Sequence, residues 1–201
     1  LTINMDGELQ EEIEFQQAMV YMGSLSMLII FGLMAIAFKS YWQPFLVLTA
    51  VPFGLMGAIF GHWMLGWQVS MFSIMGVIAC AGVVVNDNLV LIDRINNLRD
   101  EGMDLVDALL QGATDRFRPI ILTSVTTFVG LVPIMLETSV QAQFLIPMVV
   151  SLSFGVMFAT GVTLVLVPAL YLLGDDIGKF LSIVTKRELE RQDADVSPPL
   201  V

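Results

Sequence analysis

The stretch AMVYMGSLSMLIIFGLMAIAF, Ala18 to Phe38, contains no charged residue. A helix of about 20 apolar residues is long enough to cross the hydrocarbon core of a bilayer. The rest of the chain has the same character, with 14% charged residues and 56% hydrophobic residues. Soluble domains carry about a quarter charged residues. The sequence therefore predicts an all-α integral membrane protein.

Four further segments are long and apolar enough to span a membrane. The five predicted spans are about 18–38, 44–65, 69–92, 119–136 and 144–173. Between the third and fourth spans, Met103, Val106 and Leu110 recur at helical spacing opposite acidic residues. This pattern predicts one short amphipathic helix, at about 103–115, along the cytoplasmic face.

All nine basic residues fall on one side of the membrane if the spans alternate in direction. They are Lys39, Arg94, Arg99, Arg116, Arg118, Lys179, Lys186, Arg187 and Arg191. The positive-inside rule places this side in the cytoplasm. Residues 1–17 are then an external juxtamembrane segment, 18–173 one transmembrane domain, and 174–201 a cytoplasmic tail. We expect the last residues, VSPPLV, to be disordered.

Several classes of protein are disfavoured. A single Cys80 and a single His62 supply no disulfide and no cluster of Cys or His for a metal. The net charge of −10 is unlike that of a nucleic-acid binder, which is basic. No glycine-rich phosphate loop and no nucleophile–histidine pair is evident, so we expect no enzyme and no cofactor. The chain begins at Leu1 without a basic n-region, which suggests a fragment without a signal peptide.

The segment GVVVNDNLVLID, residues 82–93, places Asp87 between Asn86 and Asn88 inside the third predicted span. A charged side chain in a span costs about 2.5–3.5 kcal/mol on insertion scales, and such residues usually face a bundle interior or an aqueous path. Loss of water favours the neutral carboxyl, which makes a protonatable group accessible. The alternative is an ionised carboxylate reached by water, since Asp87 lies only ~7–8 Å from the predicted end of the span.

Three hydroxyl groups in the fourth predicted span form a second candidate. Thr123, Ser124 and Thr127 are spaced to share one face of a helix, which suits a proton or water path. Hydrogen bonding of these hydroxyls to their own helix is the other interpretation. Arg116 and Arg118 precede this span, where they serve as anchors or join a charge network with Asp87 or Asp93.

The segment GAIFG in the second predicted span contains Gly57 and Gly61 at the spacing that allows two helices to approach closely. We expect tight packing within one bundle rather than self-association.

Several ordered motifs together resemble the resistance-nodulation-division (RND) transporters. GVVVNDNLVLIDRINNLRDEG (82–102) and DRFRPIILTSVTTFVGLVPIML (115–136) resemble the tenth and eleventh spans of that family. GELQEEIEFQQAM (7–19), AFKSYWQPFLVLTAVPFGLMGAIFG (37–61) and LVPALYLL (166–173) resemble its eighth, ninth and twelfth spans. The resemblance covers about residues 7–179, and it implies that the chain corresponds to spans eight to twelve.

The resemblance implies a secondary active transporter that exports drugs or other amphiphiles by proton antiport. Such a transporter is a homotrimer of the bacterial inner membrane that works with a periplasmic adaptor and an outer-membrane channel. Residues 1–17 would then be periplasmic. Its N-terminal half, absent from this chain, supplies an acidic pair to the proton site. Two alternatives remain open: a related translocase that moves proteins or lipids, and a membrane scaffold that transports nothing.

The resemblance also implies roles for individual residues. Thr123 matches the relay threonine of the eleventh span, and Arg116 matches the arginine at its cytoplasmic entrance. Asn86 stands where multidrug pumps carry a lysine, and Asp87 stands where they carry an asparagine. The resemblance therefore implies a proton relay of Asp87, Asn86, Asn88, Thr123 and Arg116, with Asp87 as its titrating or charge-setting member.

Overall fold

The computed structural model describes the backbone of residues 2–196 and the side chains of residues 10, 11 and 13–175. Its helices are α1 (Thr2–Phe38), α2 (Trp42–Leu48), α3 (Val51–Leu65), α4 (Met71–Asp100), α5 (Leu105–Met135) and α6 (Val140–Val196). Within the described part of the chain there is no strand. Five stretches are long and apolar enough to cross a membrane: Ile13–Phe38, Trp42–Leu65, Met71–Asp100, Leu105–Met135 and Val140–Asp175. The predicted all-α membrane fold is confirmed.

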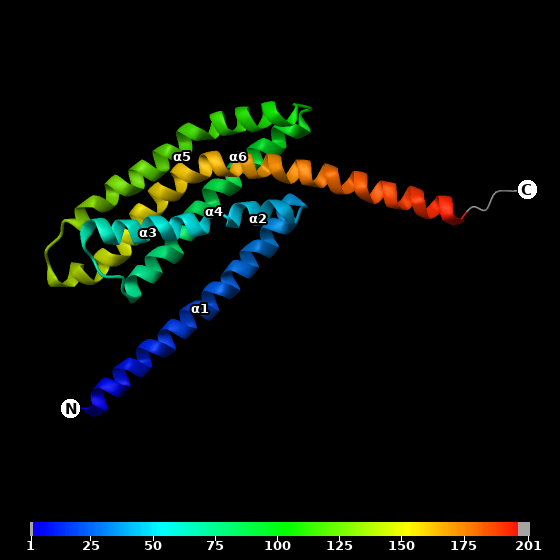
Figure 1. The fold of residues 1–201 in the computed structure, drawn as a ribbon. Coiled ribbons are helices and arrows are strands. Elements are labelled where there is room, and N and C mark those ends of the chain that lie inside the picture. Colours follow the sequence, from blue (N-terminus) through cyan, green and yellow to red (C-terminus); the bar gives the residue numbers. More distant parts are fainter. Residues whose placement is uncertain (1, 197–201) are drawn as a thin grey trace, which may run out of the picture.

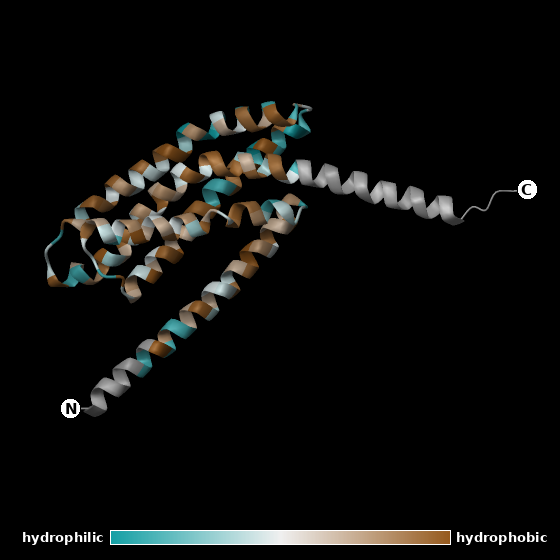
Figure 2. Ribbon diagram, viewed as in Figure 1, coloured by the Kyte–Doolittle hydropathy of each residue, from teal (hydrophilic) through white to brown (hydrophobic). Residues whose placement is uncertain are grey.

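The helices run back and forth between two ends of a bundle (Figure 1). The α1–α2 joint, the α4–α5 turn and the outgoing part of α6 lie at one end, which we call the basic end because it carries Lys39, Arg94 and Arg99. The α3–α4 and α5–α6 turns lie at the opposite end. Hydrophobic residues cover most of the helix surfaces, and hydrophilic residues gather at the α4–α5 turn (Figure 2). Exposed apolar side chains such as Leu28 and Leu122 are what lipid contact requires.

The second predicted span is interrupted between α2 and α3. Pro52 has no backbone N–H, so it cannot continue the hydrogen-bond ladder of α2. The Thr49 hydroxyl and backbone N–H instead donate to the carbonyls of Leu46 (2.6 Å) and Phe45 (3.1 Å), which closes the last turn of α2. Helix α3 then restarts with Pro52 in its first turn, a position that proline tolerates.

The amphipathic segment predicted at about 103–115 is helical from Leu105, but it is not a separate helix. It continues through Pro119 into the fourth span, so that α5 is a single helix of 31 residues. Proline removes one hydrogen bond from a helix interior. Packing compensates, because Ala108, Leu109 and Gly112 are buried on the same helix before the proline.

Helix α6 likewise passes Gly174 without ending, and it extends through most of the segment predicted as a tail. Residues 197–201, where disorder was predicted, lie outside the described residues.

Helix α1 stands apart from the rest of the bundle and approaches it only near the α2 joint (Figure 1). It ends at Phe38, and Lys39 adopts a left-handed conformation with φ 51° that redirects the chain. An apolar groove of about 590 Å³ separates α1 from α4, with Met27 on one side and Ile78 on the other.

The core of the bundle lies between α4 and α6. Leu91, Ile92 and Ile95 of α4 are fully buried, and Val167 of α6 packs with them. Small residues allow α3 to approach α6 closely. A Cβ atom added at Gly57 would lie 2.5 Å from Phe158 Cβ, and one added at Gly61 would lie 2.5 Å from Phe154 Cγ.

Three side chains at the basic end join α2, α4 and α6 in a closed hydrogen-bonded ring, which we call the amide–phenol clamp. The amides of Gln43 and Asn96 bond to each other in both directions, at 3.0 and 2.9 Å. The Tyr171 hydroxyl donates to Asn96 Oδ1 (2.9 Å) and accepts from Gln43 Nε2 (3.2 Å). Because the three groups satisfy one another in a half-buried place, the clamp fixes the relative positions of the three helices.

Replacing Asn96 with alanine is therefore expected to destabilise the protein by about 1–3 kcal/mol, because the Gln43 amide and the Tyr171 hydroxyl lose their common partner. Its neighbour Asn97 is exposed and makes one side-chain hydrogen bond, to Asp93. Asn97→Ala is the matched control, with an expected change within about 0.5 kcal/mol. Denaturation in lipid nanodiscs measures both, and equal losses would contradict a specific role for the clamp.

Candidate functional site

Asp87 lies near the middle of α4, a helix long and apolar enough to span a membrane. Its side chain is half-buried, and its Oδ2 atom is buried with no hydrogen-bond partner among the described protein atoms. A buried carboxylate oxygen without a partner is costly, so structures keep such groups where another group, water or a proton reaches them. Asp87 is the only Asp or Glu between Glu14 and Asp93.

The two asparagines beside Asp87 face different surroundings. Asn86 is exposed on the bundle surface, whereas Asn88 is only 2% exposed. The Asn88 amide nitrogen is buried and has no hydrogen-bond partner among the described atoms. The NDN segment therefore spreads its polar groups from the surface of the bundle into its interior, with Asp87 between the two.

Thr123, Ser124 and Thr127, the hydroxyl residues predicted to share one face of α5, differ in burial, and Thr127 is half-buried. Thr123 is exposed, and its hydroxyl donates to the Ile120 carbonyl at 2.8 Å. Ser124 is buried, and its hydroxyl lies 2.7 Å from that of Thr160 on α6. Successive residues of a helix are 100° apart, so contact between α5 and α6 turns Ser124 inward and leaves Thr123 outward.

The arginine at the start of the fourth span makes no ion pair with Asp87 or Asp93 within the described part of the chain. Arg116 is half-buried, and its Nε atom is buried without a partner. Asp115, next to Arg116 in the chain, pairs with Arg94 of α4 at 2.7 Å. The structure thus leaves Asp87 and Arg116 each with an unpartnered polar atom and links neither to Thr123 by a described hydrogen bond.

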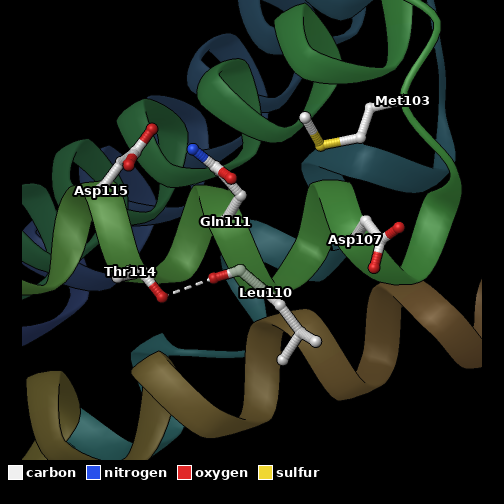
Figure 3. A pocket seen from close by; sticks show the side chains of 6 residues that line it. All are labelled: Met103, Asp107, Leu110, Gln111, Thr114 and Asp115. Carbon is white, nitrogen blue, oxygen red and sulfur yellow. Dashed lines mark hydrogen bonds between the residues drawn. The ribbon is translucent and has the colours of Figure 1, made fainter.

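A hollow of about 500 Å³ lies beside the first turns of α5 (Figure 3). It is lined by Met103, Asp107, Leu110, Gln111, Thr114 and Asp115. The Thr114 hydroxyl donates to the Leu110 carbonyl at 2.7 Å, and Asp115 is already paired with Arg94. None of its lining residues belongs to the predicted relay.

Sequence reasoning missed a polar pair at the opposite end of the bundle. His62 Nε2 lies 2.8 Å from the Ser73 hydroxyl, and both side chains are buried. The interpretation that the sequence holds no nucleophile–histidine pair was therefore wrong. The two residues are brought together by the α3–α4 hairpin, and the spacing of Ser70 and Ser73, which form a capping box, could have indicated where α4 begins.

Comparison with known proteins gives a consistent result. The family described as AcrB/AcrD/AcrF matches residues 1–175. The cobalt-zinc-cadmium resistance protein CzcA of Cupriavidus metallidurans is 34% identical over 149 residues, which cover 74% of this chain and 14% of that protein. Protein HelA of Legionella pneumophila is 32% identical over 170 residues, covering 84% of this chain and 16% of that protein. The swarming motility protein SwrC of Bacillus subtilis is 31% identical over 144 residues, covering 71% and 14%.

A solved structure supports the same relationship. The X-ray crystal structure of a heavy metal efflux pump superimposes with a TM-score of 0.72 at 29% identity. The superposition covers 82% of this chain and 16% of that one. The chain therefore spans only about a seventh of the length of the relatives it matches.

Proposed function

The chain belongs to the AcrB/AcrD/AcrF family of RND transporters, and from this premise we propose that it forms spans eight to twelve of a proton-driven exporter. In this proposal residues 1–17 lie on the periplasmic side of the inner membrane, and the basic end of the bundle lies in the cytoplasm. The N-terminal half of the same transporter is the direct partner. A homotrimer with a periplasmic adaptor and an outer-membrane channel completes the assembly.

The unpartnered Oδ2 atom of Asp87 is the observation that carries this proposal. An ionisable group inside a membrane span is expensive to keep, and transporters use such groups for proton relays. Asp87 is this half's contribution to the proton site, and Asn86 and Asn88 flank it with neutral polar groups, one on the bundle surface and one in its interior. Thr123 and Arg116 line the route from the basic end.

The motif resemblance and the named relatives point to different cargoes. The resemblance of the motifs alone favours drugs or other amphiphiles. The names of CzcA and of the solved efflux pump refer instead to heavy metals, and both cover more than two thirds of this chain. Divalent metal export is therefore the second candidate.

Reconstitution of the complete transporter that carries this chain tests the coupling and the cargo together. With a proton gradient imposed across proteoliposomes, we expect cargo to move against its own gradient as protons flow down theirs. Zn²⁺, Co²⁺ and Cd²⁺ are followed with an internal metal indicator, and an amphiphilic dye is followed by its fluorescence. Movement of metals alone selects the second candidate, and movement of the dye alone selects the first. A transport rate that does not depend on the proton gradient would overturn the proposal for either cargo.

A further inference from the structure

The imidazole of His62 lies in the last turn of α3, at the end of the bundle opposite the basic end. The Trp67 backbone N–H donates to the His62 carbonyl at 3.0 Å, and Gly66 ends the helix with a left-handed φ of 70°. The carbonyl groups at the C-terminus of a helix carry a partial negative charge, which favours a cation in that turn. The position of His62 therefore suits an imidazole that takes up a second proton.

Both ring nitrogens of His62 are hydrogen-bonded, and the side chain is only 3% exposed. Nδ1 lies 2.9 Å from the Ala58 carbonyl, which can only accept, so Nδ1 carries the proton of the neutral imidazole. Nε2 is then an acceptor, and the Ser73 hydroxyl donates to it at 2.8 Å. The hydrogen bonds thus assign one tautomer, in which Nε2 is the nitrogen that can take a further proton.

Two serines extend this bond toward the turn between α3 and α4, and we call their hydroxyl groups the serine path. The Ser73 oxygen accepts from the Ser70 backbone N–H at 3.0 Å, and the Ser70 hydroxyl lies 3.5 Å from the same oxygen. Because the Ser73 hydrogen is directed at His62, the Ser70 hydroxyl is the donor of that contact. It is longer than an ordinary hydroxyl bond, so Ser70 must rotate slightly to pass a proton. Ser70 is half-buried, whereas Ser73 is 2% exposed.

The elements packed around His62 carry few ionisable groups. Residues 40–86 and 144–174, which include α3 and the parts of α4 and α6 beside it, contain no Lys, Arg, Asp or Glu. Cys80 of α4 lies deeper in the bundle, against glycines of α3 and α6. Glu137, in the α5–α6 turn at the same end, accepts from two backbone N–H groups of its own turn. Among the described residues at this end, no side chain is a competing cation.

We propose that His62 is a proton-binding site of the bundle, reached from the α3–α4 turn through the serine path. In this step the Ser70 oxygen accepts a proton from water and passes its own hydrogen to the Ser73 oxygen. The Ser73 hydroxyl passes its hydrogen to His62 Nε2. Each hydroxyl ends with one hydrogen, and the charge rests on the imidazolium, whose Nε2–H then donates to the Ser73 oxygen. The bond from Nδ1 to the Ala58 carbonyl is unchanged, so α3 and α4 remain joined in both states.

This site shares no residue with the proposed relay through Asp87, and its test depends on neither the cargo nor the coupling. Histidine is the residue that ordinarily changes charge between about pH 5 and 8. The site therefore offers the bundle a second group that binds protons, at the end opposite the basic residues.

Nuclear magnetic resonance of the complete transporter, with ¹⁵N-labelled histidines and in lipid bilayers, tests the site. The His62 signals are those missing in His62→Gln, and also in His62→Asn, whose amide can still donate to the Ala58 carbonyl. As the pH falls from about 8 to 5, we expect Nε2 to become protonated while Nδ1 stays protonated. An Nε2 that remains unprotonated over this range would overturn the proposal. So would a neutral imidazole that carries its proton on Nε2.

The exchange of the Nε2 proton with water, measured by saturation transfer, tests the serine path. Ser70→Gly removes the outer hydroxyl but keeps the backbone N–H, and glycine is tolerated at the N-cap of a helix. We expect exchange to slow by about a hundredfold, the scale of a positioned proton-transfer group. Ser151→Ala is the matched control, because Ser151 is buried beside the same histidine but takes no part in the path. Its exchange rate should equal that of the wild type, and equal rates in Ser70→Gly and the wild type would overturn the path.

Discussion

Asp87→Asn is expected to abolish proton-driven transport while the protein still folds and inserts normally. The amide has almost the same shape as the carboxyl group and keeps its hydrogen-bonding capacity, but it neither takes up nor releases a proton. The Asp87 Oδ2 atom has no partner among the described atoms, so the substitution breaks no described side-chain bond. The expected loss of coupled transport is on the order of a hundredfold or more, the scale contributed by a positioned acid–base group.

Proton influx coupled to cargo movement in proteoliposomes measures this loss, with membrane expression quantified in parallel. Asp93→Asn is the matched control, because Asp93 lies on the same helix but is exposed and accepts one bond, from Asn97 at 3.3 Å. Its transport rate should be close to that of the wild type. Normal efflux by Asp87→Asn at normal expression would show that Asp87 has no role in proton coupling. Asp87→Glu retains a titratable group and should recover part of the activity.

Gly57→Ala is expected to destabilise the bundle by about 1–3 kcal/mol, and by more if the helices cannot separate. The added methyl group would lie 2.6 Å from the Phe154 carbonyl oxygen and 3.1 Å from Gly155 Cα, so it meets backbone rather than a side chain that can rotate away. Helix α3 must therefore move away from α6, which reduces the packing on which helix association in membranes depends.

Thermal denaturation in nanodiscs measures the effect, and Gly161→Ala on α6 is its control. No heavy atom lies within 4 Å of a Cβ atom added at Gly161. Alanine there should be neutral or stabilising by up to about 1 kcal/mol, since it has the higher helix propensity. If the two variants unfold alike, close approach at Gly57 does not hold α3 against α6.

The membrane spans could be predicted from the sequence because hydrophobic length alone determines whether a helix crosses the bilayer. The ends of the helices could not. Pro52 interrupts its span, whereas Pro119 lies inside an unbroken α5, and the difference depends on what each neighbouring turn packs against. The sequence around each proline does not indicate that packing.

The residues of the candidate site could likewise be predicted only in part from the sequence. Asp87 was singled out because a carboxyl group within an apolar span is conspicuous in any sequence. The inward direction of Ser124 depends on its contact with Thr160, 36 residues further along the chain. The bond between His62 and Ser73 forms only once the α3–α4 hairpin has closed.

The joint at Lys39 makes α1 a lever arm with its fulcrum at the basic end. Its 37 residues give a length of about 55 Å at ~1.5 Å per residue. A rotation of about 10° around the joint would carry the far end through about 10 Å, while the residues beside α2 would shift by less than the width of a side chain. On the other side of the joint, the amide–phenol clamp holds α2 against α4 and α6. A small backbone rotation at this one residue would therefore change the width of the apolar groove between α1 and α4.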